Sequence, residues 1–141
     1  MARQKDYLDN ATPSANSMAA VALLRLAALT GEDLCRDRAE VILTLFGPMA
    51  QSTPTAFAHL LAALDLARRG VTEVVVTGDR PDLVAVVTAN YRPEVVLAWG
   101  NPFDSPLWEG RGDDRAYVCE HFACKQPADT VEELAAQLGD T

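Results

Sequence analysis

The hydrophobic pattern changes its period at Gly70, and this change constrains the fold more than any other feature of the chain. Before Gly70 the apolar residues recur at helical spacing. Residues 73–77 form a short valine-rich run that is typical of a buried strand. We therefore predict an α/β (α+β) fold in two parts, a helical region at residues 1–70 and a small β-α-β-β-α subdomain at residues 71–141.

The first part is predicted to contain three helices, at residues 14–30, 32–46 and 53–70, the last with Thr53 as its cap. The first of these helices is apolar on nearly every side, so some of its surface must face a partner. The alanine content of all three allows their axes to approach closely. The side chains expected to pack are Leu34, Cys35, Val41, Ile42 and Leu45 in the second helix, and Phe57, Leu60, Leu61, Leu64 and Ala67 in the third.

The second part alternates strands with helices. Strands at residues 73–77 and 94–98 flank a helix at residues 81–90, for which Asp79 is the expected cap. A helix of this size is the usual crossover between neighbouring strands, so these two strands should run parallel.

The end of the chain is predicted to hold a hairpin and a helix, after a turn-rich loop at residues 100–114. Residues 116–119 form a third strand, and residues 122–124 return beside it. Thr130 and Glu133 have the spacing of a capping box, in which each side chain bonds the other residue's backbone N–H, so a helix should begin there.

Charge excludes two classes of partner. The chain carries 12 Lys+Arg and 20 Asp+Glu, a net charge of −8, and all of the excess lies after residue 70. No basic patch is present to neutralise phosphates, which argues against nucleic acid and anionic membranes. No apolar run approaches the roughly 20 residues that span a bilayer. Residues 1–6 do not begin a secretory signal, so we expect a cytoplasmic protein.

A dense polar cluster precedes the first helix and is one candidate site. Hydroxyl and amide groups next to exposed helix N–H donors suit the binding of a sugar or an anion. Simple helix capping is the alternative reading, and the residues alone leave both open. The candidate ligand-binding residues are Asp9, Asn10, Ser14, Asn16 and Ser17.

Cys119 and Cys124 are the second candidate site, and Cys35 lies far from both. Across a tight hairpin their sulfurs could meet and form a reversible redox pair, although two reduced, packed thiols are the alternative. The spacing fits neither a C-x-x-C redox motif nor a zinc site, so we predict no metal and no cofactor. His59 and the turn at residues 78–80 are interpreted as structural, and no catalytic set can be assigned.

Three stretches of the chain together resemble one protein family. Residues 9–17, D-N-A-T-P-S-A-N-S, resemble a D-N-A-x-P-S-G-N-S motif with Ala15 in place of its glycine, and residues 73–78 resemble an E-I-V-I-x-G strand. Residues 116–127 resemble the ending Y-V-C-E-N-F-A-C-x-x-P. The family is the thioredoxin-domain proteins of the YyaL type, related to the spermatogenesis-associated thioredoxin-like protein.

This resemblance implies a larger architecture than the chain itself contains. Family members begin with a thioredoxin-like domain, continue as an (α/α)6 barrel similar to six-hairpin glycosidases and sugar epimerases, and end as this chain does. The helical region would then be the last helices of that barrel, with the polar cluster of residues 9–17 lining its cavity. Ala15 adds a Cβ where the backbone of a ligand site needs close approach.

These observations lead to one main hypothesis and two alternatives. The main hypothesis is a non-catalytic C-terminal region or short relative of this family, acting as a structural or small-ligand (carbohydrate) binding module. The alternatives are a redox-responsive module using Cys119 and Cys124, and part of a carbohydrate-active, epimerase- or glycosidase-like enzyme. We expect the helical half either to self-associate as a homodimer or to pack against the remainder of a longer chain.

Overall fold

The protein divides into two compact units, seen in a computed structural model that describes residues 7–140. The helical unit contains the chain up to Ala27 together with Glu32–Arg69, and the sheet unit contains Ala28–Gly31 and the chain from Gly70 onward. The expectation about a signal at residues 1–6 lies outside the described residues. Within them, no helix is both long and apolar enough to cross a membrane.

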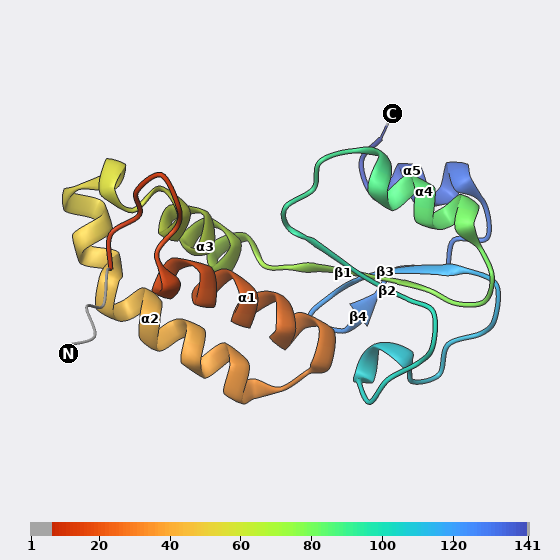
Figure 1. Cartoon of the computed structure of the whole chain (residues 1–141). Coiled ribbons are helices and arrows are strands. Elements are labelled where there is room, and N and C mark those ends of the chain that lie inside the picture. The colour runs from red at the N-terminus through yellow and green to blue at the C-terminus, as the bar shows by residue number, and fades with distance from the viewer. Residues whose placement is uncertain (1–6, 141) are drawn as a thin grey trace. The chain divides into compact units, whose positions relative to one another are not determined.

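The helical unit is built from most of α1 (Ala15–Thr30), the end of which belongs to the sheet unit, and from α2 (Asp33–Ser52), the 3₁₀ turn η1 (Pro54–Ala56) and α3 (Ala58–Arg69) (Figure 1). Gly31 and Gly70 take the left-handed conformation directly after α1 and α3, with φ of 77° and 88°, as glycines that end helices do. The core of the unit is small and rich in alanine. It consists of Ala20, Leu43, Ala50, Phe57, Leu60 and Ala63.

Helix α2 corrects two of the expectations. It continues through Pro48 to Ser52, six residues past the predicted end. Proline has no N–H, so one hydrogen bond of the helix is missing at Pro48, and the helix tolerates this loss. Its buried residues are Leu43 and the small residues Ala39, Gly47 and Ala50, and the small ones let neighbouring backbone come close. Of the predicted packing residues, Ile42 does pack against the core, whereas Leu34, Val41 and Leu45 were predicted wrongly and are 57%, 67% and 64% exposed.

The start of the third helix was also predicted wrongly. Pro54 opens the 3₁₀ turn η1, and α3 begins four residues later, at Ala58. Thr53 makes no side-chain cap bond. Instead, the first free N–H groups of α3, those of His59 and Leu60, are bonded by the carboxylate of Asp9 from far away in the sequence.

The sheet unit contains four strands in the order β2-β1-β3-β4. The central strand β1 (Thr72–Val76) pairs in parallel with β2 (Val95–Trp99) and antiparallel with β3 (Ala116–Glu120), and β3 pairs with the two-residue strand β4 (Ala123–Cys124). Helices α4 (Pro81–Ala89) and α5 (Val131–Gln137) lie on the same side of the sheet (Figure 1). The predicted α/β fold, with its parallel strand pair, is thereby confirmed.

The two faces of the sheet have separate cores. Val74, Val76 and Val118 pack with α4 and α5 on one face. On the other face Val75, Tyr117 and Cys119 pack with Leu107 and with the end of α1 at Leu29. The 3₁₀ turn η2 (Pro106–Trp108), within the long loop, covers this second face, where the disulfide described below also lies.

Helix caps in the sheet unit agree with the prediction at one end and not at the other. The capping box of Thr130 and Glu133 is present and confirms the predicted start of α5. Helix α4 is preceded by Arg80 and has no side-chain cap, so the predicted capping role of Asp79 was wrong. The division of the chain into independent domains at residue 70 stays a prediction.

Candidate functional site

Cys119 and Cys124 face each other directly across the hairpin formed by β3 and β4, and their sulfurs form a disulfide. Cys119 lies on an inner strand and is fully buried, whereas Cys124 lies on the edge strand and is half-buried. The structure therefore joins the pair that the sequence singled out, with one cysteine buried and the other only partly buried. Cys35, in α2, is a free cysteine.

The turn of this hairpin is conformationally unfavourable. It consists of His121 and Phe122, between the paired residues Glu120 and Ala123, and both turn residues have positive φ, 52° and 63°. Two-residue hairpin turns of this kind favour Asn and Gly, because a side chain in the left-handed region crowds the backbone. The disulfide closes a hairpin whose own turn and two-residue strand contribute little stability.

Arg111 brings a positive charge to the disulfide. Its Nη2 lies 2.8 Å from the Sγ of Cys124 and 3.9 Å from the Sγ of Cys119. Its Nε donates to the carbonyl of Leu107 at 3.0 Å, and its guanidinium carbon lies 4.9 Å from the centre of the Tyr117 ring. A cation placed this close to sulfur favours the thiolate over the thiol once the disulfide is reduced.

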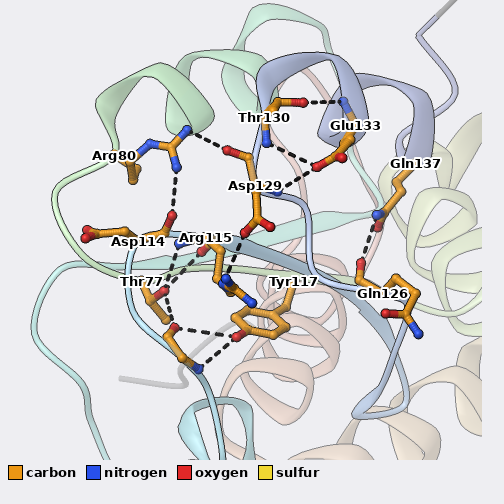
Figure 2. Close-up of polar contacts among 11 residues, drawn as sticks. Thr77, Arg80, Asp114, Arg115, Tyr117, Gln126, Asp129, Thr130, Glu133 and Gln137 are labelled. Atoms are coloured by element: carbon orange, nitrogen blue, oxygen red, sulfur yellow. Dashed lines mark hydrogen bonds and ion pairs between the residues drawn. The ribbon is translucent and has the colours of Figure 1, made fainter.

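The loop that carries Arg111 is anchored at the next residue, Gly112. Thr77, just after β1, donates its hydroxyl to the Gly112 carbonyl at 2.7 Å, and the Gly112 N–H donates to the Tyr117 hydroxyl at 2.8 Å. Figure 2 shows Thr77 and Tyr117 converging on this loop, beside the ion pair of Arg115 with Asp129. These bonds connect the loop to two adjacent strands, so the position of Arg111 is held by the sheet.

Glu73 places a buried carboxyl on the same side of the sheet as the disulfide. It lies directly opposite Cys119 in the antiparallel pair of β1 and β3, where opposite side chains project to one face. Its Oε2 accepts a hydrogen bond from the N–H of Phe122 at 3.3 Å. Burial raises the pKa of Glu73 above its ordinary value, and the Phe122 bond and the charge of His121 offset this only in part.

This set of groups suits two-electron chemistry at sulfur. It combines a half-buried cysteine, a fully buried cysteine, a fixed cation and a carboxyl whose neutral form burial favours. Among residues 7–140, no group of three or more His, Cys, Asp or Glu side chains lies together in a way that could hold a metal ion.

Asp9, in the polar cluster, is engaged with the protein's own backbone. Its carboxylate accepts from the N–H of Ser14 at 2.8 Å and from the N–H groups of His59 and Leu60 at 2.8 and 3.1 Å. Burial alone would raise the pKa of this carboxyl, but the hydrogen bonds, led by that from Ser14, outweigh burial and lower it. Asp9 thus closes its own loop and caps α3.

Ser14 and Ser17 cap the other helix of the cluster. Ser14 Oγ accepts from the N–H of Ser17 at 3.2 Å and lies 2.9 Å from its hydroxyl, and both residues are buried. Asn16 is half-buried in the first turn of α1, and Asn10 is exposed. The capping alternative therefore accounts for the buried members of the cluster.

A hollow of about 320 Å³ lies beside this cluster. It brings together two of the predicted ligand-binding residues, Asp9 and Asn10, with His59, while Ser14, Asn16 and Ser17 are not part of its lining. The Nε2 of His59 is buried without a hydrogen-bond partner in the described part of the chain. Ligand binding by the five cluster residues stays a prediction.

Arg111 and Glu73 were missed by sequence reasoning. Glu73 could have been noticed, because it is an acidic residue within a valine-rich strand that was predicted to be buried. Burying a carboxyl costs free energy, so such a residue is a candidate for a functional role. Arg111 carried none. It lies in a turn-rich loop, and its approach to the sulfurs depends on how that loop folds back over the sheet.

The chain is similar along nearly its whole length to spermatogenesis-associated protein 20. The Homo sapiens protein is 35% identical over 152 residues and the Rattus norvegicus protein 34% identical over 154, in each case across 96% of this chain. The chain spans about a fifth (19%) of the length of these relatives. No family model and no solved structure matches.

This similarity confirms that the chain is related to the spermatogenesis-associated protein, as its sequence motifs indicated. The YyaL-type assignment, the thioredoxin-like domain and the barrel stay predictions.

Proposed function

We propose that this chain is a non-catalytic, redox-responsive segment of a longer protein. The proposal agrees with its similarity to about one fifth of the length of spermatogenesis-associated protein 20. The pair Cys119 and Cys124 is its responsive element. The observation that carries the proposal is the disulfide across a two-residue strand whose turn has positive φ at both residues. Reduction removes the covalent link and leaves a hairpin with little stability of its own.

The size of the response follows from the loop that the disulfide closes. The two cysteines are five residues apart, and a loop this short corresponds to about 2 kcal/mol of chain entropy. The left-handed turn residues oppose the hairpin by roughly 1 kcal/mol each. The N–H of Lys125 donates to the carbonyl of Val118 at 2.9 Å and is one of the few bonds that hold β4 without the disulfide.

The test is thermal unfolding of the chain with and without a dithiol reductant. We expect the reduced protein to unfold several degrees lower, and re-oxidation to restore the original midpoint. A variant with both Cys119→Ser and Cys124→Ser should not respond to reductant, while Cys35→Ser should respond like the unmodified chain. Alkylation without reductant, followed by mass spectrometry, should label Cys35 alone. Two freely labelled thiols in the pair would refute the proposal.

A second candidate function is binding of a small polar ligand, such as a carbohydrate, in the hollow beside Asp9. The buried, unpartnered Nε2 of His59 favours it, because a ligand hydroxyl could supply the missing hydrogen bond. A thermal-shift screen with a sugar library tests this function. A shift abolished by Asn10→Ala, which lines the hollow, and retained by Asn16→Ala, which does not, would support it. No shift with any sugar would count against it.

The helical unit is proposed to self-associate through α2. Leu34, Val41 and Leu45 lie along one line of this helix, at spacings of seven and four residues, and all three are exposed. A second copy of the chain would cover this face and form a homodimer. Light scattering at micromolar concentration should give the mass of a dimer, and Val41→Glu should give that of a monomer. A monomeric mass for the unmodified chain would contradict the proposal.

A further inference from the structure

The two cysteines of the disulfide differ in burial and in their distance from Arg111, two factors that affect exchange with an external thiol. Cys124 is half-buried on the edge strand, whereas Cys119 is fully buried between β1 and β4. A thiolate attacks one sulfur in line with the bond it breaks, so access decides which sulfur is attacked. Cys124 is the more exposed of the two residues, so attack is expected at its sulfur, and Cys119 becomes the leaving group.

We propose that Cys124 is a site of mixed-disulfide formation with small thiols, that Arg111 stabilises its thiolate, and that Glu73 exchanges a proton with Cys119. This inference rests on the proposed redox function and assigns the roles within it. Under this inference, the disulfide exchanges with external thiols at Cys124 and not at Cys119.

Arg111 supplies the electrostatic part. Its Nη2 is 1.1 Å nearer to Cys124 than to Cys119, from the difference between 2.8 and 3.9 Å. Its Nε is held by the Leu107 carbonyl and its plane by the Tyr117 ring, so the cation does not need to reorganise when charge develops on sulfur.

Glu73 supplies the proton. It stands opposite Cys119, which carries the leaving sulfur, and burial favours its neutral form. The charged and titratable groups that the described contacts bring to the pair are Arg111 from the loop, Glu73 from β1, Tyr117 from β3 and His121 from the turn. Of these, Glu73 is the acid on the side of Cys119.

With a dithiol as reductant, the exchange balances in two steps. In the first, one thiolate of the reductant attacks Cys124 Sγ, the protein S–S bond breaks, and its electron pair leaves on Cys119, which takes the proton of Glu73. In the second, the reductant's other thiol loses its proton to solvent and attacks the reductant sulfur of the mixed disulfide. Cys124 then departs as a thiolate beside Arg111. The dithiol ends as a cyclic disulfide, the protein pair has gained two electrons, and solvent returns a proton to Glu73.

The first experiment maps the adduct. The Cys35→Ser protein is reduced, freed of reductant and reacted briefly with glutathione disulfide, and the modified cysteine is identified by peptide mass spectrometry. We expect glutathione on Cys124. An adduct found on Cys119 would overturn the inference.

The second experiment measures the rate of carboxymethylation of each cysteine in the reduced protein from pH 6 to pH 9.5. At pH 6.5 we expect Cys124 to react at least about tenfold faster than Cys119. Arg111→Met should slow Cys124 about tenfold at pH 6.5 and much less at pH 9.5, with Arg111→Lys between the two. Arg115→Met is the matched control, because Arg115 pairs with Asp129 and makes no contact with sulfur. If Arg111→Met behaves like Arg115→Met, Arg111 has no such role.

The third experiment isolates Glu73. Glu73→Gln keeps the size of the side chain and an oxygen to accept the Phe122 N–H, so it preserves the hairpin. We expect it to slow reduction of the disulfide by dithiothreitol several-fold at pH 6, while leaving carboxymethylation of Cys124 unchanged. Unchanged reduction in this variant would remove Glu73 from the mechanism.

The outcomes distinguish the proposed redox function from the roles assigned to Cys124, Arg111 and Glu73. A pair that does not form and break reversibly, or whose reduction leaves the unfolding temperature unchanged, refutes the proposed function. A pair that does so, but reacts at Cys119 or ignores Arg111, refutes only the assignment of roles.

Discussion

Among residues 7–140, each unit of the molecule buries one carboxylate, and the two are held in opposite ways. In the helical unit, Asp9 accepts three backbone N–H bonds of 2.8 to 3.1 Å, which lower its pKa in spite of burial. In the sheet unit, Glu73 accepts a longer bond, of 3.3 Å, from the N–H of Phe122, and burial outweighs this and the other backbone bonds to raise its pKa. A carboxylate saturated with donors acts as a fixed structural element, whereas one that is poorly bonded can exchange a proton.

The largest loss of stability is expected from substitution of Asp9. Asp9→Ala leaves the buried N–H groups of Ser14, His59 and Leu60 without an acceptor, and each unsatisfied donor costs on the order of 1 kcal/mol or more. The free energy of unfolding, measured by urea denaturation of the chain, should fall by about 3 kcal/mol. Asp65→Asn, which removes an exposed carboxylate from α3 paired with Arg69, serves as the control and should cost less than about 0.5 kcal/mol. Equal effects of the two variants would show that Asp9 has no special role.

The same contact marks the limit of prediction from sequence. The start of α5 was predictable because Thr130 and Glu133 cap it from three residues apart. The start of α3 was not, because its cap is Asp9, about fifty residues away, while Thr53 and Pro54 gave a misleading local signal. A cap of that kind becomes visible only once the chain has folded.

The packing faces and the redox site were also predictable only where the signal is local in the sequence. Helix α2 has apolar residues on several sides, so periodicity could not choose between the face of Ala39 and Leu43 and the face of Val41 and Leu45. The cysteine pair was recognisable from its spacing across a hairpin. The position of Arg111 was not recognisable, because it depends on the path of a long loop.

A smaller effect is expected from pH, with opposite signs for the two carboxylates. The pKa of Asp9 is lowered, so its contribution to stability is present above its ordinary value of 3.8 and is lost as pH falls through the folded value. The pKa of Glu73 is raised, so its contribution is present below the ordinary value of 4.5 and is lost as pH rises through the folded value.

Glu73→Gln should therefore gain stability relative to the unmodified chain as pH rises from 4 to 8, by about 1 kcal/mol, the scale of an ordinary buried polar interaction. Urea denaturation at each pH measures the difference. Glu120→Gln, exposed at the end of β3, is the control and should show a flat difference. If the difference in unfolding free energy between Glu73→Gln and the unmodified chain also does not change with pH, ionisation of the buried carboxyl does not destabilise the fold.

The smallest effect is expected at the turn beside Glu73. His121 has a φ of 52°, a conformation that Asn tolerates better than other residues with a side chain. The family ending that this part of the chain resembles has Asn at this place. His121→Asn should therefore stabilise the chain by about 0.5 kcal/mol in the oxidised form.

The gain from His121→Asn should be larger after reduction, because the hairpin then depends on its turn rather than on the disulfide. Urea denaturation of both redox forms measures the two gains. A gain of the same size in both forms would show that turn and disulfide stabilise the hairpin independently. The substitution also removes a charge that partly offsets the burial of Glu73, so the pKa of Glu73 should rise further. In that case the stability that Glu73→Gln gains between pH 4 and pH 8 should be larger in the His121→Asn background than in the unmodified chain, which links the turn to the carboxyl that distinguishes the sheet unit from the helical unit.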